Sequence, residues 1–261
     1  MLQFTVPLCY ATLGGWLVRH DPTNDRGLTF AAMGAVLLAH ALMLGQMLSM
    51  HKAVSLSIGE LLSLIGFAVA LAALAGAARA RSKILAGSSL ILAAVLSAAS
   101  TFGTQQVSTG PLGWPLLAHV VLSVLSYALL SIAAVTAVFL ALKHRALKSG
   151  VAALQSPSRI SIEALETELF GAIGAGFGCL SLAIFSGLFY VDDMFAQHLA
   201  HKTVLTIASW VFFGILLIGR WRFGWRAQTA VRWTLGGFAT LLLAYFGSRI
   251  VLEQLLQRQW G

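Results

Sequence analysis

Charged residues are scarce in this chain of 261 residues, and their scarcity is the first constraint on its class. Aspartate, glutamate, lysine and arginine make up only 10% of the sequence, whereas a soluble domain carries roughly 25%. No polar stretch is long enough to form a separate soluble domain. The apolar runs are too long for barrel strands and do not alternate, so the composition predicts an all-α, polytopic integral membrane protein.

Cysteine and the common catalytic motifs are also rare or missing. The two cysteines, Cys9 and Cys179, lie far apart inside apolar segments and form no CxxC pair, so we expect no thiol redox centre. There is no CxxCH, which excludes covalent attachment of a c-type heme to this chain. The sequence has no GxSxG, HExxH or P-loop motif, so no hydrolase, zincin or nucleotide site is indicated.

Hydrophobic residues are abundant instead, at 58% of the chain, with a mean hydropathy of +0.85. A membrane-spanning helix needs about 20 apolar residues. The stretches that meet this requirement are 2–18, 28–50, 56–78, 83–103, 114–142, 168–190, 203–219 and 230–252. The first stretch lacks a basic n-region and a cleavage site, so we expect it to be retained. The sequence thus predicts one transmembrane domain, residues 1–261, with about eight helices.

The distribution of basic residues predicts the orientation of these spans. Most of the 17 lysine and arginine residues fall in the connections after the first, third, fifth and seventh spans. The positive-inside rule places those connections in the cytoplasm and both termini outside. Topology thereby accounts for the formal charge of +8, and no nucleic-acid partner is expected. In the long internal connection 143–167, Ser161 is expected to begin a short surface helix.

Histidines gather on the external side of this topology. His119 lies five residues into its span, roughly 7–8 Å below the external end. His198 and His201 are three residues apart, on one face if that stretch is helical, and Lys202 follows. His51 closes the second span, and His40 lies deeper within it. Because imidazole is costly in hydrocarbon, this pattern indicates metal or heme ligation, proton handling or a polar cavity.

Several ordered segments resemble one known family. They are Trp114, His119 and Ser126-Tyr127-Ala128, then His201-Lys202-Thr203 through Ser209-Trp210, then Gly224-Trp225-Arg226, and finally Tyr245-Phe246-Gly247-Ser248. In this order and spacing they resemble the cytochrome c assembly proteins of the CcsA/CcmC type, and the short format is most similar to the YpjD/HemX-like branch. The first segment resembles the one that carries an external heme-ligand histidine in that family.

The resemblance implies a multi-pass protein of the bacterial cytoplasmic (inner) membrane that binds or relays heme near the external face. The heme would be b-type and non-covalent, held stably or in transit, and the partners would be lipid, heme and other cytochrome assembly or membrane proteins. His119 and His201 are the candidate axial ligands of the iron, and His198, His40 and Lys202 are further candidate heme contacts. The family carries a tryptophan-rich WWD motif where residues 192–202 have no tryptophan, so synthetase activity is not expected.

Two other functions remain open from the sequence. A transporter or exporter of a small molecule or ion would use a cavity lined by His40 and Glu60, although no repeat between the two halves is evident. An accessory or regulatory membrane subunit would use the connection 143–167 as its partner surface.

Overall fold

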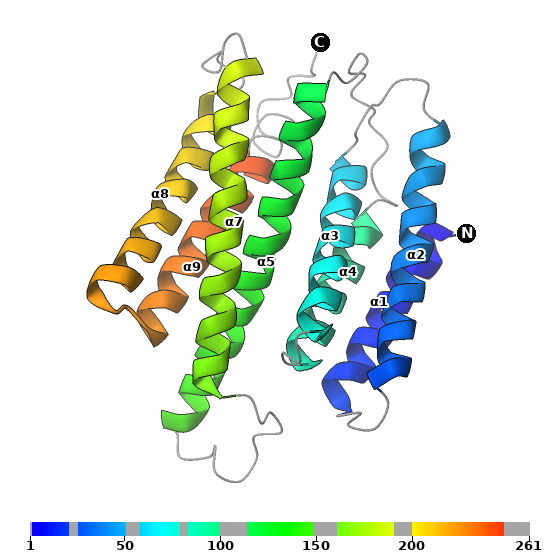
Figure 1. The fold of residues 1–261 in the computed structure, drawn as a ribbon, viewed down its shortest axis with the longest axis horizontal. Coiled ribbons are helices and arrows are strands. Elements are labelled where there is room, and N and C mark those ends of the chain that lie inside the picture. The colour runs from blue at the N-terminus through cyan, green and yellow to red at the C-terminus, as the bar shows by residue number, and fades with distance from the viewer. Residues whose placement is uncertain are drawn as a thin grey trace. The chain divides into compact units, whose positions relative to one another are not determined.

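The computed structural model describes residues 2–20, 26–50, 58–78, 83–99, 114–148, 161–190 and 200–247. All regular structure in these ranges is helical, which confirms the all-α prediction (Figure 1). The helices are α1 (Leu2–Arg19), α2 (Arg26–Met50), α3 (Ile58–Ala78), α4 (Lys83–Ala98), α5 (Trp114–Lys148), α7 (Ile162–Tyr190), α8 (Ala200–Phe223) and α9 (Ala227–Leu242), followed by the π-helical turn η2 (Leu243–Gly247).

Five of the described helices are long and apolar enough to cross a membrane: α2, α3, α5, α7 and α8. The shorter helix α4 is apolar as well. A bilayer core of about 30 Å needs about 20 helical residues, which these five helices supply. The chain is therefore a polytopic membrane protein, while the number of eight spans and the external termini stay predictions.

The chain forms two compact units, Met1–Val135 and Thr136–Gly261, and helix α5 contributes to both. In the first unit α4 packs against α1 and α3, and α2 also packs against α1 and α3. Glycine makes the tightest of these contacts possible: a Cβ on Gly87 would lie 2.8 Å from the Gly14 carbonyl oxygen. Small residues let helix backbones approach in this way, so α1 and α4 cross at this glycine pair.

In the second unit α8 packs against α7, α9 and η2. The Ser209 hydroxyl donates to the Gly237 carbonyl at 2.9 Å, which joins α8 to α9 inside the unit. The Trp210 indole N–H donates to the Ser181 hydroxyl at 2.8 Å, and its ring stacks on Phe177 at 5.5 Å between centroids. Helix α8 is thus joined to α7 and to α9 by both packing and a hydrogen bond.

The expected surface helix beginning at Ser161 is not a separate element. Helix α7 is continuous from Ile162 to Tyr190, and Ser161 is its N-cap, accepting a bond from the Ala164 N–H at 3.1 Å. The Ser161 hydroxyl thus pairs one of the free N–H groups at the start of α7. The negative charge of Glu163 in the first turn is also favourable at this end of the helix. The helix start expected at Ser161 is therefore confirmed, and it is the start of the sixth span itself. The partner surface expected at 143–167 falls partly outside the described residues.

Candidate functional site

His40 lies at the centre of a buried polar site in the first unit. Its side chain has no exposed surface, and neither do those of Tyr10 on α1 and Ser63 on α3. The Nδ1 atom is 3.2 Å from the Tyr10 hydroxyl, and the Nε2 atom is 2.9 Å from the Ser63 hydroxyl. The ring also meets Tyr10 and Phe67 edge-on, with centroids 5.5 and 5.4 Å away. The imidazole therefore links three helices.

Both ring nitrogens of His40 are used in this arrangement. A neutral imidazole has one donor and one acceptor nitrogen, and a hydroxyl can fill either role, so one tautomer satisfies the whole group. A buried polar side chain needs such partners, because an unpaired group of this kind is unfavourable by about 1–3 kcal/mol. Ligation of an iron by His40 would require the loss of its hydrogen bond to Tyr10 or Ser63. Its role as a heme contact stays a prediction.

His119 lies in the second turn of α5 and is half-buried. Residues four and seven positions later, Ser123 and Ser126, share its helix face, and Ser126 is fully buried. Trp114 and Val121, on the opposite side of α5, are 84% and 48% exposed, and Leu116, one turn before His119, is 40% exposed. The imidazole thus lies on a partly buried face of α5 that it shares with Ser123 and Ser126, and ionisable groups in membrane-spanning helices are usually functional.

The other predicted site residues, Lys202, His201 and His198, lie at or just before the start of α8 in the sequence. Lys202 is exposed in its first turn, with Nζ 5.7 Å from the centre of the Tyr245 ring. His201 lies beside it in the same turn, but its side chain falls outside the described part of the chain. His51 and His198 also lie outside the described residues. Within the described part of the chain, no group of three or more histidine, cysteine or acidic side chains could hold a metal ion.

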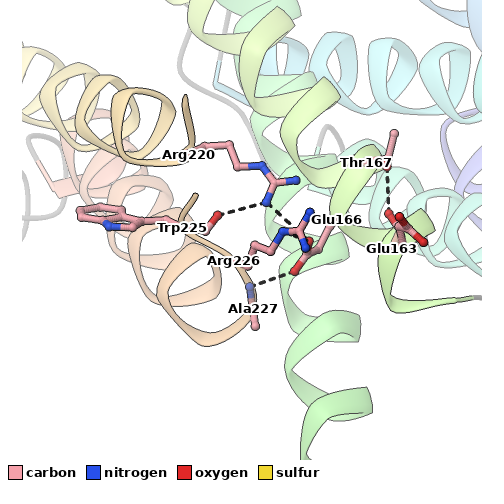
Figure 2. Close-up of polar contacts among 7 residues, drawn as sticks. All are labelled: Glu163, Glu166, Thr167, Arg220, Trp225, Arg226 and Ala227. Atoms are coloured by element: carbon pink, nitrogen blue, oxygen red, sulfur yellow. Dashed lines mark hydrogen bonds and ion pairs between the residues drawn. The ribbon is translucent and has the colours of Figure 1, made fainter. Parts of the chain in front are cut away.

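A second polar cluster, absent from the sequence-based predictions, surrounds Glu166 in the second unit (Figure 2). This residue of α7 is only 6% exposed. One carboxylate oxygen, Oε2, lies 3.6 Å from Arg220 Nη1 and 3.6 Å from Arg226 Nε. The other, Oε1, accepts the Ala227 backbone N–H at 3.0 Å. Glu166 therefore caps the first turn of α9 from a neighbouring helix, where a negative charge is favourable.

The turn between α8 and α9 explains why this carboxylate is needed. Gly224 has φ +64°, a left-handed conformation that suits glycine and ends α8. Ala227 has φ +52°, which is unusual for a residue with a Cβ. Arg226, at the N-cap of α9, makes no side-chain capping bond. The bond from Ala227 to Glu166 thus stabilises a strained backbone at a helix start that its own N-cap residue leaves without a capping bond.

The sequence pattern indicates the Glu166 cluster only weakly. Three acidic residues, Glu163, Glu166 and Glu168, stand near the start of α7, so Glu166 is not singled out, and its partners Arg220 and Arg226 lie more than fifty positions away. The arginines were assigned to topology, which explains their side of the membrane but not their pairing. The pattern that indicates such a cluster is an acidic residue one turn after an N-cap, combined with an arginine-rich turn elsewhere in the chain.

Comparison with known proteins identifies relatives along nearly the whole chain. A family profile described as "Cytochrome C assembly protein" matches residues 27–256. The "Inner membrane protein YpjD" of Escherichia coli (strain K12) is 32% identical over 265 aligned residues, covering 97% of this chain and 93% of that protein. An Azospirillum brasilense protein described as "Uncharacterized 28.8 kDa protein in nifR3-like 5'region" is 36% identical over 141 residues, covering 53% of this chain and 52% of that protein. No solved structure matches.

The family match extends from the start of α2 past the end of η2, so it includes His40, His119, Glu166 and the start of α8. The resemblance seen in the sequence is thereby confirmed, as is the assignment to a multi-pass inner membrane protein. The chain belongs to the cytochrome c assembly protein family and is a heme-handling membrane protein.

Proposed function

We propose that this protein binds or relays a non-covalent b-type heme near the external face of the membrane, with His119 as an axial ligand of the iron. The observation that carries the proposal is the position of His119. It is half-buried on a face of α5 that also carries Ser123 and Ser126, about 7–8 Å from the end of the helix. An imidazole at that depth can reach iron from within the protein while the heme edge stays near the headgroups.

The remaining heme contacts follow from the sequence. The sequence predicts His201, with His198 as the alternative, as the second axial ligand, because two histidines can occupy both axial positions of a heme iron. Lys202 is exposed at the same helix start and is suited to a heme propionate, since a cation at headgroup depth attracts a carboxylate. His40 is left out of this ligand set because Tyr10 and Ser63 occupy both of its ring nitrogens.

In this proposal the protein contributes ligation and orientation, and the heme contributes the redox chemistry. The absence of a tryptophan-rich motif in residues 192–202 supports a binding or relay role without synthetase activity. Other cytochrome assembly proteins are the proposed partners. The transporter alternative has no specific support: its key residue His40 is fully buried and hydrogen-bonded on both sides.

An absorption spectrum of the detergent-purified protein, oxidised and then reduced with dithionite, tests the proposal. We expect a Soret band with sharp reduced α and β bands, typical of low-spin heme with two axial ligands. His119→Gly should lose these bands, and added imidazole should restore them by entering the space left by the side chain. His20→Ala is the matched control, because His20 is exposed just after α1. A protein without heme after expression in a heme-replete host, and without a band after added hemin, would refute the proposal.

A further inference from the structure

Positive charge concentrates where α8 turns into α9. We call residues 220–227 the elbow; it contains Arg220, Arg222 and Arg226. Neither α8 nor α9 contains an aspartate or glutamate, so these arginines have no acidic neighbour on their own helices. Glu166 supplies a single negative charge from α7. The elbow therefore keeps an excess of positive charge.

The arginines of the elbow differ in how they are used. Arg220 faces inward: it donates to the Trp225 carbonyl at 3.3 Å, pairs with Glu166 and lies 4.6 Å from the centre of the Phe170 ring. Arg226 contacts Glu166 only at 3.6 Å, longer than a direct hydrogen bond, and its side chain is 66% exposed. Arg222 is exposed as well. A guanidinium has five N–H donors, so Arg222 and Arg226 can bind an external anion.

Exposed aromatic rings flank these two arginines. Trp221 is 82% exposed and Phe223 is 74% exposed, both in the last turn of α8. The guanidinium carbon of Arg222 lies 5.9 Å from the centre of the Trp221 ring. Trp225 differs, because its ring packs directly on Gly219. Exposed aromatic side chains at the end of a membrane-spanning helix favour the boundary between headgroups and acyl chains.

We propose that the elbow is a binding site for the phosphate of an anionic phospholipid. Arg222 and Arg226 hold the phosphate, because the planar guanidinium matches its oxygens in bidentate geometry. Trp221 and Phe223 rest against the glycerol and upper acyl region of the same lipid. The net positive charge selects an anionic headgroup over a zwitterionic one, whose cationic end the arginines repel. The exposed aromatic rings favour a lipid over a free phosphate ion, which offers them no apolar surface.

Glu166 sets the affinity of this site. Its carboxylate attracts Arg226 and lowers the positive charge available to a lipid phosphate. Glu166→Gln removes that charge but keeps a carbonyl oxygen that accepts the Ala227 N–H, so the start of α9 retains its cap. The proposal therefore predicts that this variant binds the lipid more tightly. A purely structural role for the cluster predicts no such gain.

Native mass spectrometry of the full-length protein in detergent, titrated with phosphatidylglycerol or phosphatidylcholine, tests the site. We expect tighter binding of phosphatidylglycerol, weakened about fivefold by Arg222→Gln and by Arg226→Gln, since each arginine near a membrane surface contributes about 1 kcal/mol. Glu166→Gln should strengthen binding by a similar factor. Trp221→Ala should weaken both lipids alike, because it removes apolar contact without changing charge.

Arg19→Gln is the control, since Arg19 is exposed in the last turn of α1 in the other unit and should leave binding unchanged. Equal affinity for the two lipids, or wild-type affinity in both arginine variants, would overturn the proposal. Full displacement of phosphatidylglycerol by millimolar inorganic phosphate would overturn it in favour of a free-anion site. The measurement needs no heme, so its outcome is separate from that of the heme proposal.

Discussion

Removing the His40 side chain should strongly destabilise the first unit, because this residue of α2 is hydrogen-bonded to both α1 and α3. The imidazole is the only described link between the Tyr10 hydroxyl of α1 and the Ser63 hydroxyl of α3, through bonds of 3.2 and 2.9 Å. His40→Ala breaks both bonds at once and leaves a cavity at a site with no exposed surface. The two hydroxyls are then affected unequally, because only the serine can find a new partner within its own helix.

Ser63 can turn its hydroxyl back to a carbonyl of α3, as serines in helices commonly do. Tyr10 has no such option, so its buried hydroxyl stays unpaired, which is unfavourable by about 1–3 kcal/mol. The cavity adds about 2 kcal/mol or more, at the low end of large-to-small core substitutions. We therefore expect His40→Ala to lower the free energy of unfolding by about 3–5 kcal/mol. Ser63→Ala should lower it by a smaller amount, about 1–3 kcal/mol, because it creates little cavity but leaves the buried Nε2 of His40 unpaired.

Unfolding of the purified protein in mixed detergent and dodecyl sulfate micelles, followed by helical circular dichroism, measures these differences. His40→Gln keeps a donor and an acceptor and should recover part of the loss. His20→Ala, an exposed histidine, should stay within about 0.5 kcal/mol of wild type. The reasoning fails if His40→Ala is as stable as wild type. If that variant is stable but loses a Soret band, His40 is a heme ligand and the proposed ligand set is wrong.

Two further predictions concern stability in the same assay. Gly87→Ala should destabilise the protein by about 1–3 kcal/mol, because its Cβ would meet the rigid Gly14 carbonyl at 2.8 Å. Gly76→Ala is the control and should be neutral or stabilising, because a Cβ there would meet nothing within 4 Å. Equal effects would contradict the close crossing of α1 and α4. Glu166→Ala should destabilise the protein by about 1–3 kcal/mol, which is less than the loss of a fully buried ion pair because the two arginines are partly exposed. Glu163→Ala, at an exposed position one turn earlier, should have little effect. Similar losses in both would show that the cap on α9 is unimportant.

Local hydropathy was sufficient to predict the helical segments. The apolar stretch 28–50 corresponds to α2 (Arg26–Met50), and 83–103 contains α4 (Lys83–Ala98). Boundaries were less reliable where polar residues continue a helix. Helix α7 begins at Ile162, before the expected start at residue 168, because the Ser161 cap and the burial of Glu166 extend it across an acidic stretch.

Side-chain partners could not be predicted in the same way, because they depend on residues far apart in sequence. The sequence placed His40 inside a span and made it a candidate heme contact, but nothing in the pattern linked it to Tyr10 or Ser63. Trp221 and Trp225 lie four positions apart in the same connection, and nothing in the sequence distinguishes them. The structure separates them, since Trp225 packs on Gly219 while Trp221 is exposed.

The sequence by itself determined the class of this protein, because the free energy of moving a helix into lipid depends on the composition of that helix alone. Segment hydropathy, the bias of basic residues and the ordered family motifs were sufficient for that. Only the tertiary structure decided which polar groups are satisfied inside the membrane. A buried imidazole or carboxylate is stabilised by the particular donors and acceptors that neighbouring helices bring to it, and those contacts arise from packing.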